Sequence, residues 1–288
     1  MERKQRLQQA QEFTWRNARL IERFLFSYLF AAGGKEPVLA ALRAYQNEDG
    51  GFGNALEPDK RCPDSQPQDV EVALHILDAI DAMHDPMVLH ACDFLVTITT
   101  SEGGVPYALP SVNAYPHAPW WTVEGQPAAA LNPTAAIVGL LLKHHIQHPW
   151  VETAARFCWQ QIAATDTTEF HTLMPVLTFL EHAPDRQSAE HELQRIAVRL
   201  TQPGIIELDP SAQGYIQKPL DWAPTPHSFC RHLFSDEIIA QHLVALAARQ
   251  QSDGGWPIAW DAISPAVEIE WRGRVTIDAL RTLDAYAY

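Results

Sequence analysis

Two copies of one short motif constrain the fold of this chain more than any other feature. Residues 46–53 read QNEDGGFG and residues 250–257 read QQSDGGWP, so Gln-x-x-Asp-Gly-Gly-aromatic occurs once near each end of the chain. Each copy follows an Ala- and Leu-rich segment with helical spacing. A pattern that returns along a chain indicates a repeat architecture. We therefore expect one structural unit to be used several times.

Weaker copies define the length of that unit. Glu102-Gly103-Gly104 is a third copy, and Pro203-Gly204 is a decayed one. The acidic or turn positions of the four copies, 49, 102, 203 and 253, are separated by 53, 101 and 50 residues. These intervals fit a unit of about 50 residues, with one further copy expected near FCWQQIAATDTTEF. No boundary interrupts the series, so a single domain is predicted over residues 1–288.

Helical segments of two kinds alternate along the chain. Segments 86–99, 149–163 and 187–201 are amphipathic, whereas segments 66–82, 131–146 and 168–183 are apolar nearly all round. A helix that is apolar on every side is buried on every side. The alternation predicts an all-α fold, an α/α toroid of about five to six inner and outer helix pairs.

Long connections mark one end of the predicted toroid. The segments that lead from an outer to an inner helix are long, at 49–65, 102–131, 203–234 and 253–268. Because every inner helix begins at the same end, we expect these loops to share one face. Long loops in a compact domain are usually functional, so this face is the candidate ligand-binding face.

The two Gly-Gly turns are assigned a structural role. A left-handed residue closes the end of a helix at little cost when it is glycine. We expect Gly51 and Gly255 to be those residues and Asp49 and Asp253 to hold the turns. The neighbouring positions are expected to fill gaps and to satisfy backbone groups: Phe52, Trp256, Gln46 and Gln250.

YQNEDGGFG and RQQSDGGWP resemble the glutamine-tryptophan repeat of terpenoid cyclases and of protein prenyltransferase β subunits. The resemblance implies a toroid with a central, mostly apolar cavity, in which relatives cyclise polyprenes or bind isoprenyl diphosphates. Complement-like thioester domains of the same superfamily lack such chemistry, so the fold does not settle the function. The family's Asp-x-Asp-Asp, Asp-Asp-x-x-Asp, Asp-x-Cys and Cys-Gly-Glu-Gln strings do not occur here. The resemblance therefore implies a fold and transfers no catalytic residue.

Charge and cysteine usage narrow the class of protein. The formal net charge is −14, from 21 basic and 35 acidic side chains, which disfavours nucleic acid as a partner. The chain starts without the apolar core of a signal peptide, and its longest apolar runs are too short to span a bilayer. The cysteines are scattered, which indicates a reducing compartment. We predict a cytoplasmic protein with a small-molecule ligand, no membrane span and no cofactor, whose oligomeric state is left open.

One dense cluster raises the question of a metal. The string DWAPTPHSFCRHLF contains His227, Cys230 and His232, with Asp221 as a possible fourth ligand. These residue types bind zinc, but zinc ligands are usually better separated and paired. Cys230 also fits a core position, so no metal site is predicted.

Aromatic residues on three of the long loops and on the last helical segment suggest a lined pocket. Aromatic faces can stabilise a cation or stack on a sugar, although the same rings could simply pack the loops onto the helices. Trp121, Trp222 and Trp271 are expected to converge. The full set of predicted ligand-binding residues is Trp120, Trp121, Trp222, His227, Trp271 and Arg274.

Carboxylates near the same face are the catalytic candidates. Burial raises the pKa of a carboxyl group and suits it to general acid or base chemistry. The predicted catalytic residues are Glu268, Glu270, Asp69 and Asp221, and the first long loop adds Glu57 and Asp59. Arg272 and Arg274 could equally be ion-pair partners of Glu268 and Glu270.

Three functions fit these observations. The first is a terpenoid-cyclase-like toroid that binds an apolar isoprenoid-type molecule in a central cavity, with its transformation left open. The second is a glycan-active lyase or hydrolase on an α/α barrel, and the third is a non-catalytic toroid that binds a ligand or a protein. A buried carboxylate pair favours an enzyme, solvated carboxylates favour a binding module, and a groove lined by flat tryptophan faces favours a sugar.

Overall fold

The computed structural model describes residues 3–288, which form α-helices joined by loops and short 3-10 helices. Within this range pairing between extended segments is limited to three isolated β-bridges. The chain divides into two compact units. Lys35–Ile196 form the central unit, and Met1–Gly34 with Ala197–Tyr288 form the terminal unit. The single domain predicted from the sequence stays a prediction.

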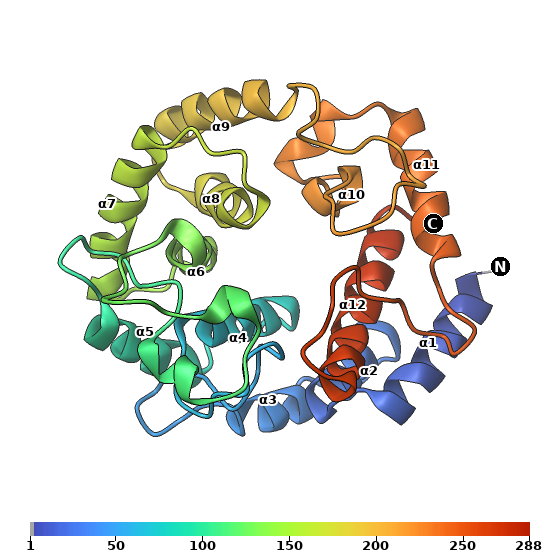
Figure 1. Ribbon diagram of the computed structural model, residues 1–288, viewed down its shortest axis with the longest axis horizontal. Helices are drawn as coiled ribbons and strands as arrows, with labels where there is room; N and C mark the ends of the chain where they lie inside the picture. Colours follow the sequence, from blue (N-terminus) through green and yellow to red (C-terminus); the bar gives the residue numbers. More distant parts are fainter. Residues whose placement is uncertain (1–2) are drawn as a thin grey trace. The chain divides into compact units, whose positions relative to one another are not determined.

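The central unit is built around three apolar helices, α4 (Pro67–Ala79), α6 (Leu131–Lys143) and α8 (Phe170–His182). Helix α6 packs against both α4 and α8, and most of its residues are buried (Figure 1). The predicted apolar segments thus form helices as expected. The remaining elements of the unit are α3 (Glu36–Arg43), α5 (Pro86–Ile98), η1 (Pro110–Ala114), η2 (Pro119–Trp121), α7 (Pro149–Ala164) and α9 (Arg186–Leu200), whose last residues enter the terminal unit.

Local sequence explains where several of these helices begin. Proline occupies the first turn of α4, α5 and α7, where its missing N–H has no partner to lose. Asp85 caps α5 by accepting the N–H of Met87 at 3.0 Å. Glu169 caps α8 by accepting the N–H groups of His171 and Thr172. These contacts satisfy donors that a helix leaves free at its start.

The terminal unit is organised by its last helix. Helix α12 (Pro265–Ala285) packs against α1 (Arg3–Asn17), α2 (Leu20–Phe30) and α11 (Asp236–Ala248). The unit also contains α10 (Pro219–Trp222) and η3 (Phe229–Leu233). Among residues 3–288 no helix combines the length and the apolar character needed to cross a membrane.

The N-terminal turn (residues 46–51) connects α3 to the first long loop. The Gln46 side chain donates to the Gly50 carbonyl at 2.9 Å and to the Met87 carbonyl at 3.0 Å, so it ties the turn to the start of α5. Asp49 Oδ1 accepts the Gly51 N–H at 2.9 Å and the Ser65 hydroxyl at 2.7 Å. The structural role predicted for this turn is supported by these contacts.

The C-terminal turn (residues 250–255) repeats this geometry at the end of α11. Gln250 donates to the Gly254 carbonyl at 2.8 Å and to the Arg6 carbonyl of α1 at 3.0 Å. Asp253 Oδ1 accepts the Gly255 N–H at 3.0 Å and also binds Arg272. The two turns therefore share a geometry, whereas a repeat along the whole chain stays a prediction.

The prediction that the second glycine of each turn is left-handed is wrong. Gly50 has φ +87° and Gly254 has φ +94°, so the first glycine carries the positive φ. The second glycine is required for space instead. A Cβ atom on Gly51 would lie 2.5 Å from the Ser65 Cβ, and one on Gly255 would lie 2.7 Å from the Phe13 ring.

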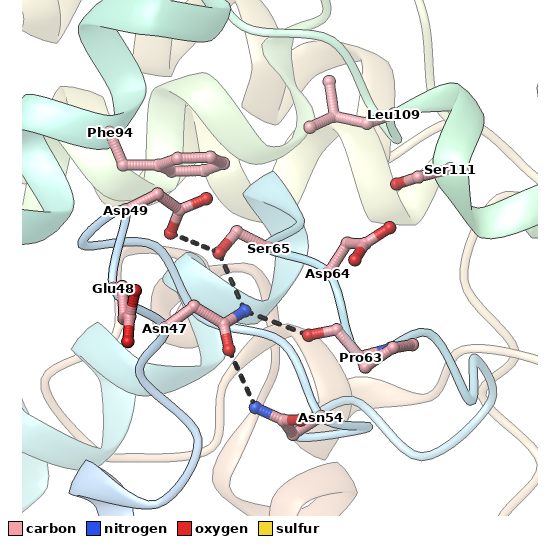
Figure 2. A pocket seen from close by; sticks show the side chains of 10 residues that line it. All are labelled: Asn47, Glu48, Asp49, Asn54, Pro63, Asp64, Ser65, Phe94, Leu109 and Ser111. Atoms are coloured by element: carbon pink, nitrogen blue, oxygen red, sulfur yellow. Dashed lines mark hydrogen bonds between the residues drawn. The ribbon is translucent and has the colours of Figure 1, made fainter.

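A shallow pocket of about 500 Å³ opens beside the N-terminal turn. Figure 2 shows Asn47, Asp49 and Ser65 joined by hydrogen bonds across its floor. Phe94 lies on one side and Leu109 on the other. None of its ten lining residues is a tryptophan. The pocket therefore lacks the flat tryptophan faces that would favour a sugar.

Candidate functional site

A buried group of charged side chains lies at the start of α4. The ammonium nitrogen of Lys60 is 2.9 Å from Asp69 Oδ2 and 3.3 Å from Glu57 Oε2. Lys60 is 0% exposed, Asp69 1% and Glu57 5%. Charges removed from water to this degree persist only with close partners. We call Glu57, Lys60 and Asp69 the buried ionic cluster.

Asp69 organises the cluster because both of its oxygens are used. It lies in the first turn of α4, where a carboxylate is favoured by the helix dipole. Asp69 Oδ1 accepts the backbone N–H of Glu57 at 2.7 Å, while Oδ2 faces Lys60. One carboxylate therefore fixes the loop backbone and pairs with the buried ammonium group.

The second long loop (residues 99–130) is fastened to the first by backbone and side-chain hydrogen bonds. The Ala118 N–H donates to the Asp59 carbonyl at 2.8 Å. The buried side chain of Gln66 accepts the Leu109 N–H at 2.8 Å and donates to the Ser111 hydroxyl at 2.9 Å. These contacts hold the second loop over the buried ionic cluster.

The second loop contributes two aromatic rings to the site. Trp121, in η2, lies over Lys60, with its ring centroid 4.5 Å from the ammonium nitrogen. Tyr107 stacks on Trp121 at a centroid distance of 4.6 Å and an interplanar angle of 15°. A cation above an indole face is attracted by the ring's negative surface. The lysine is therefore enclosed by two carboxylates and one aromatic face.

The electrostatics of the cluster separate its two carboxyl groups. Burial raises the pKa of Glu57 to about 7, assisted by the nearby charges of Asp69 and Asp59 and opposed by Lys60. Burial alone would lower the pKa of Lys60, but the carboxylates of Asp69 and Glu57 outweigh it and raise that pKa. Lys60 is thus a permanent cation, whereas Glu57 exchanges its proton near neutral pH.

This arrangement can perform proton transfer. A general acid or base works best when its pKa lies near the working pH, and buried carboxyl groups are tuned in this way. Glu57 meets that requirement, and Lys60 at 3.3 Å can stabilise its ionised form. The buried carboxylate pair of Glu57 and Asp69 also matches the feature that favours an enzyme.

Two predicted site residues, Asp69 and Trp121, meet at this cluster, and Trp120 beside them is 47% exposed. The sequence analysis placed Glu57 near the candidate ligand-binding face but did not identify Lys60. The available signal was one lysine among four acidic residues in the segment 57–69. Lysine is rarely buried, and a buried lysine cannot be recognised from the sequence unless its partners are known.

The terminal unit contains the remaining predicted aromatic residues. Trp271, in α12, makes an edge contact with Trp260 at a centroid distance of 5.1 Å. Tyr215 contacts Trp260 at 5.7 Å. Trp222 is buried in α10, and His227 is exposed. The convergence of Trp121, Trp222 and Trp271 stays a prediction.

The predicted carboxylates of the terminal unit differ from the buried ionic cluster in their exposure. Glu268 is exposed and Glu270 is half-buried. Asp221 is exposed by its surface area and accepts the Lys218 N–H at 2.7 Å, although desolvation of its carboxyl group raises its pKa. Their catalytic roles stay predictions.

The two arginines of α12 form ion pairs with aspartates. Arg272 binds Asp253 through two contacts of 2.8 Å, and Arg274 binds Asp278 at 3.1 Å. Arg272 therefore holds the C-terminal turn, and a ligand-binding role for Arg274 stays a prediction.

The cluster that contains Cys230 and His232 was the metal site considered from the sequence. Cys230 is buried, while His232 bonds the Phe229 carbonyl through Nδ1. Across residues 3–288 no three histidine, cysteine or acidic side chains are grouped so that they could hold a metal ion. Cys62, Cys92 and Cys158 are buried free thiols as well.

Comparison with known proteins identifies the fold. No family model matches the chain, and no curated protein matches its sequence. A crystal structure of a protein from Actinoplanes has a TM-score of 0.62 at 16% identity and covers 100% of both chains. The apo structure of the type II terpene cyclase MstE from Scytonema has a TM-score of 0.53 at 13% identity, over 97% of this chain and 88% of that one.

A variant of the same cyclase, in complex with its substrate geranylgeranyl dihydroxybenzoate, has a TM-score of 0.52 at 13% identity. It covers 98% of this chain and 97% of that one. At these identities the likeness establishes the fold alone. The all-α toroid class predicted from the repeated motif is confirmed.

Proposed function

We propose that this protein binds an apolar, isoprenoid-type small molecule and transfers a proton to or from it through Glu57. The observation that carries the proposal is the buried ionic cluster, found in a chain with the fold of a terpene cyclase. The cyclase of that fold is described with a geranylgeranyl substrate. A ligand with a long apolar chain is therefore the class that the fold favours.

The kind of proton transfer follows from the acidity of Glu57. A carboxyl group whose pKa is raised to about 7 is a weaker acid than an ordinary carboxyl group. Such a group gives its proton to an oxygen or nitrogen atom more readily than to an alkene carbon. When Glu57 donates its proton, the carboxylate that remains is stabilised by Lys60 at 3.3 Å.

The other members of the cluster have supporting roles in the proposal. Asp69 keeps Lys60 in place and holds the Glu57 backbone, so it acts as a positioning residue. Trp121 covers the ammonium group and keeps water from it. Lys60 remains charged and sets the ease with which Glu57 ionises.

The proposal is tested by binding and turnover with matched molecules. The purified chain would be titrated with geranylgeranyl dihydroxybenzoate, with a straight-chain alkyl dihydroxybenzoate of equal length, and with an oligosaccharide. We expect saturable binding of the isoprenoid, weaker binding of the straight chain and no binding of the sugar. Binding of the sugar without the isoprenoid would contradict the proposed ligand class.

The role of Glu57 is tested separately. Products would be followed by mass spectrometry and NMR over a pH series that spans pH 7, the region of the Glu57 pKa. Glu57→Gln should retain binding and lose turnover, because glutamine cannot release a proton. Glu190→Gln, at an exposed position on α9, is the matched control and should behave as the unmodified chain. Full turnover by Glu57→Gln would refute the assignment.

A further inference from the structure

The indole N–H groups of the tryptophans divide into two classes. Trp150 Nε1 donates to the Thr99 hydroxyl at 2.7 Å, and Trp256 Nε1 donates to the Leu246 carbonyl at 2.8 Å. Trp121 is 5% exposed and its Nε1 is buried, yet no acceptor among residues 3–288 lies within hydrogen-bonding distance. Trp260 and Trp271 share this feature but are less buried.

An unpaired buried donor is unusual in a folded protein. Nearly all buried N–H groups have an acceptor, and an exception calls for an explanation such as a functional role. The two faces of Trp121 are already accounted for by Lys60 at 4.5 Å and by the stacked Tyr107. The ring is therefore held in place by its faces, while the N–H at its edge has no hydrogen-bond partner among residues 3–288.

The surroundings of Trp121 are those of the proposed site. The cation over its ring is Lys60, which is paired with Glu57 and Asp69. These carboxylates are committed to the ammonium group and to the loop backbone. The indole N–H thus belongs to a ring that contacts the buried ionic cluster through Lys60.

We propose that the indole N–H of Trp121 donates a hydrogen bond to an oxygen atom of the bound ligand. The inference rests on the proposed function and narrows its ligand class. The ligand is then an isoprenoid that carries an oxygen-containing head group, such as a phenol, ketone or ester, and not a pure hydrocarbon. Trp121 determines specificity for that oxygen and takes no part in bond making or breaking.

The test removes the donor and preserves the shape of the ring. Trp121 would be replaced by 3-benzothienylalanine, in which sulfur takes the place of the indole N–H, and Trp121→Phe would serve as a second variant. The probes are geranylgeranyl dihydroxybenzoate and geranylgeranylbenzene, which share the chain and the ring but differ in oxygen. Dissociation constants would be measured for the full chain with each probe.

We expect the benzothienyl variant to bind the oxygen-containing probe roughly five- to tenfold more weakly. Its affinity for geranylgeranylbenzene should not change, and its melting temperature should equal that of the unmodified chain because no hydrogen bond is lost. The same replacement at Trp256 is the matched control. It should lower the melting temperature, since its N–H binds the Leu246 carbonyl, and leave the ratio of the two affinities unchanged.

Two outcomes would overturn the inference in different ways. If the unmodified chain binds both probes and the benzothienyl variant binds each probe as tightly as the unmodified chain does, the Trp121 donor does not contact the ligand. The proposed function then still stands. If the unmodified chain binds neither probe, the proposed function fails and the inference fails with it.

Discussion

The N-terminal and C-terminal turns contain the same hydrogen bonds, yet their aspartates bind different partners. In both, a glutamine side chain crosses the turn to the first glycine and to the start of another helix. Asp49 accepts a hydrogen bond from the Ser65 hydroxyl group. Asp253 instead binds the guanidinium group of Arg272, which also lies over the Phe13 ring.

The difference shows which part of the motif determines the turn and which part is free to vary. The glycines and the glutamine define the backbone path, because they appear with the same contacts in both units. The partner of the aspartate depends on the helix or loop that follows. In the central unit it is the loop that leads to the buried ionic cluster, and in the terminal unit it is α12.

The largest expected effect breaks both turns alike. In Gly50→Ala the new Cβ would lie 2.3 Å from the His90 carbonyl oxygen, and in Gly254→Ala 2.1 Å from that of Gln9. Each change combines a positive φ with a backbone clash and should lower the free energy of unfolding by about 3–5 kcal/mol. Chemical denaturation measures this loss. Gly204→Ala, with a positive φ and no neighbour within 4 Å, is the control and should lose about 1 kcal/mol.

The second effect is a response to pH that comes from Glu57 in the central unit. The pKa of Glu57 is 4.5 when unfolded and about 7 when folded, so the folded chain retains a proton that the unfolded chain releases between these values. The contribution of Glu57 to stability is complete below pH 4.5 and is lost as pH rises through 7. The loss is on the order of 3 kcal/mol.

This pH response can be measured as a difference between two chains. The free energy of unfolding of the unmodified chain, minus that of Glu57→Gln, should fall across the interval from pH 4.5 to 7. A difference that is constant with pH would show that Glu57 titrates normally in the folded chain.

The smallest effects distinguish the side chains that anchor the two aspartates, Arg272 for Asp253 and Ser65 for Asp49. Arg272→Met should cost about 2 kcal/mol, since it removes the guanidinium nitrogen that bonds both Asp253 oxygens and a hydrogen bond to the Trp256 carbonyl. The figure is modest because the Asp253 side chain is 45% exposed. Ser65→Ala removes the hydrogen bond that the hydroxyl donates to the Asp49 carboxylate and the one that it accepts from Asn47, and should cost about 1.5 kcal/mol.

Salt and acid provide a further contrast between the anchors. The Arg272 contribution should shrink at high ionic strength, whereas the Ser65 contribution should not. Partial burial raises the pKa of Asp253, but hydrogen bonds from Arg272 and Gly255 outweigh it and lower that pKa. The stability supplied by Arg272 should therefore be lost as pH falls through the lowered pKa of Asp253. Equal salt sensitivity of the two variants would contradict the assignment of an ionic anchor.

Much of the fold could be predicted because its signals are local. The apolar segments that became α4, α6 and α8 are recognisable from periodicity, and prolines mark several helix starts. The choice between Gly50 and Gly51 could not be made in this way. Both positions demand glycine, one for its positive φ and the other for a close contact with Ser65 and Phe94 that depends on packing.

The candidate site was less accessible to sequence reasoning. Asp69 and Trp121 could be named because a carboxylate and an aromatic residue on long loops suggest chemistry. Lys60 could not, because its burial depends on contacts with Asp69 and Trp121 from two other segments. The same applies to the pKa of Glu57, which is set mainly by burial and only secondarily by neighbouring charges.

Infrared difference spectroscopy of the titrating carboxyl groups tests the central claim most directly. The absorbance of a protonated carboxyl group would be followed against pH in the unmodified chain and in Glu57→Gln. A protonated band that disappears with a midpoint of about 7, and is missing from Glu57→Gln, is the predicted result. If every carboxyl band disappears near the ordinary value of 4.5, Glu57 is ionised at neutral pH and cannot serve as the proton-exchanging group.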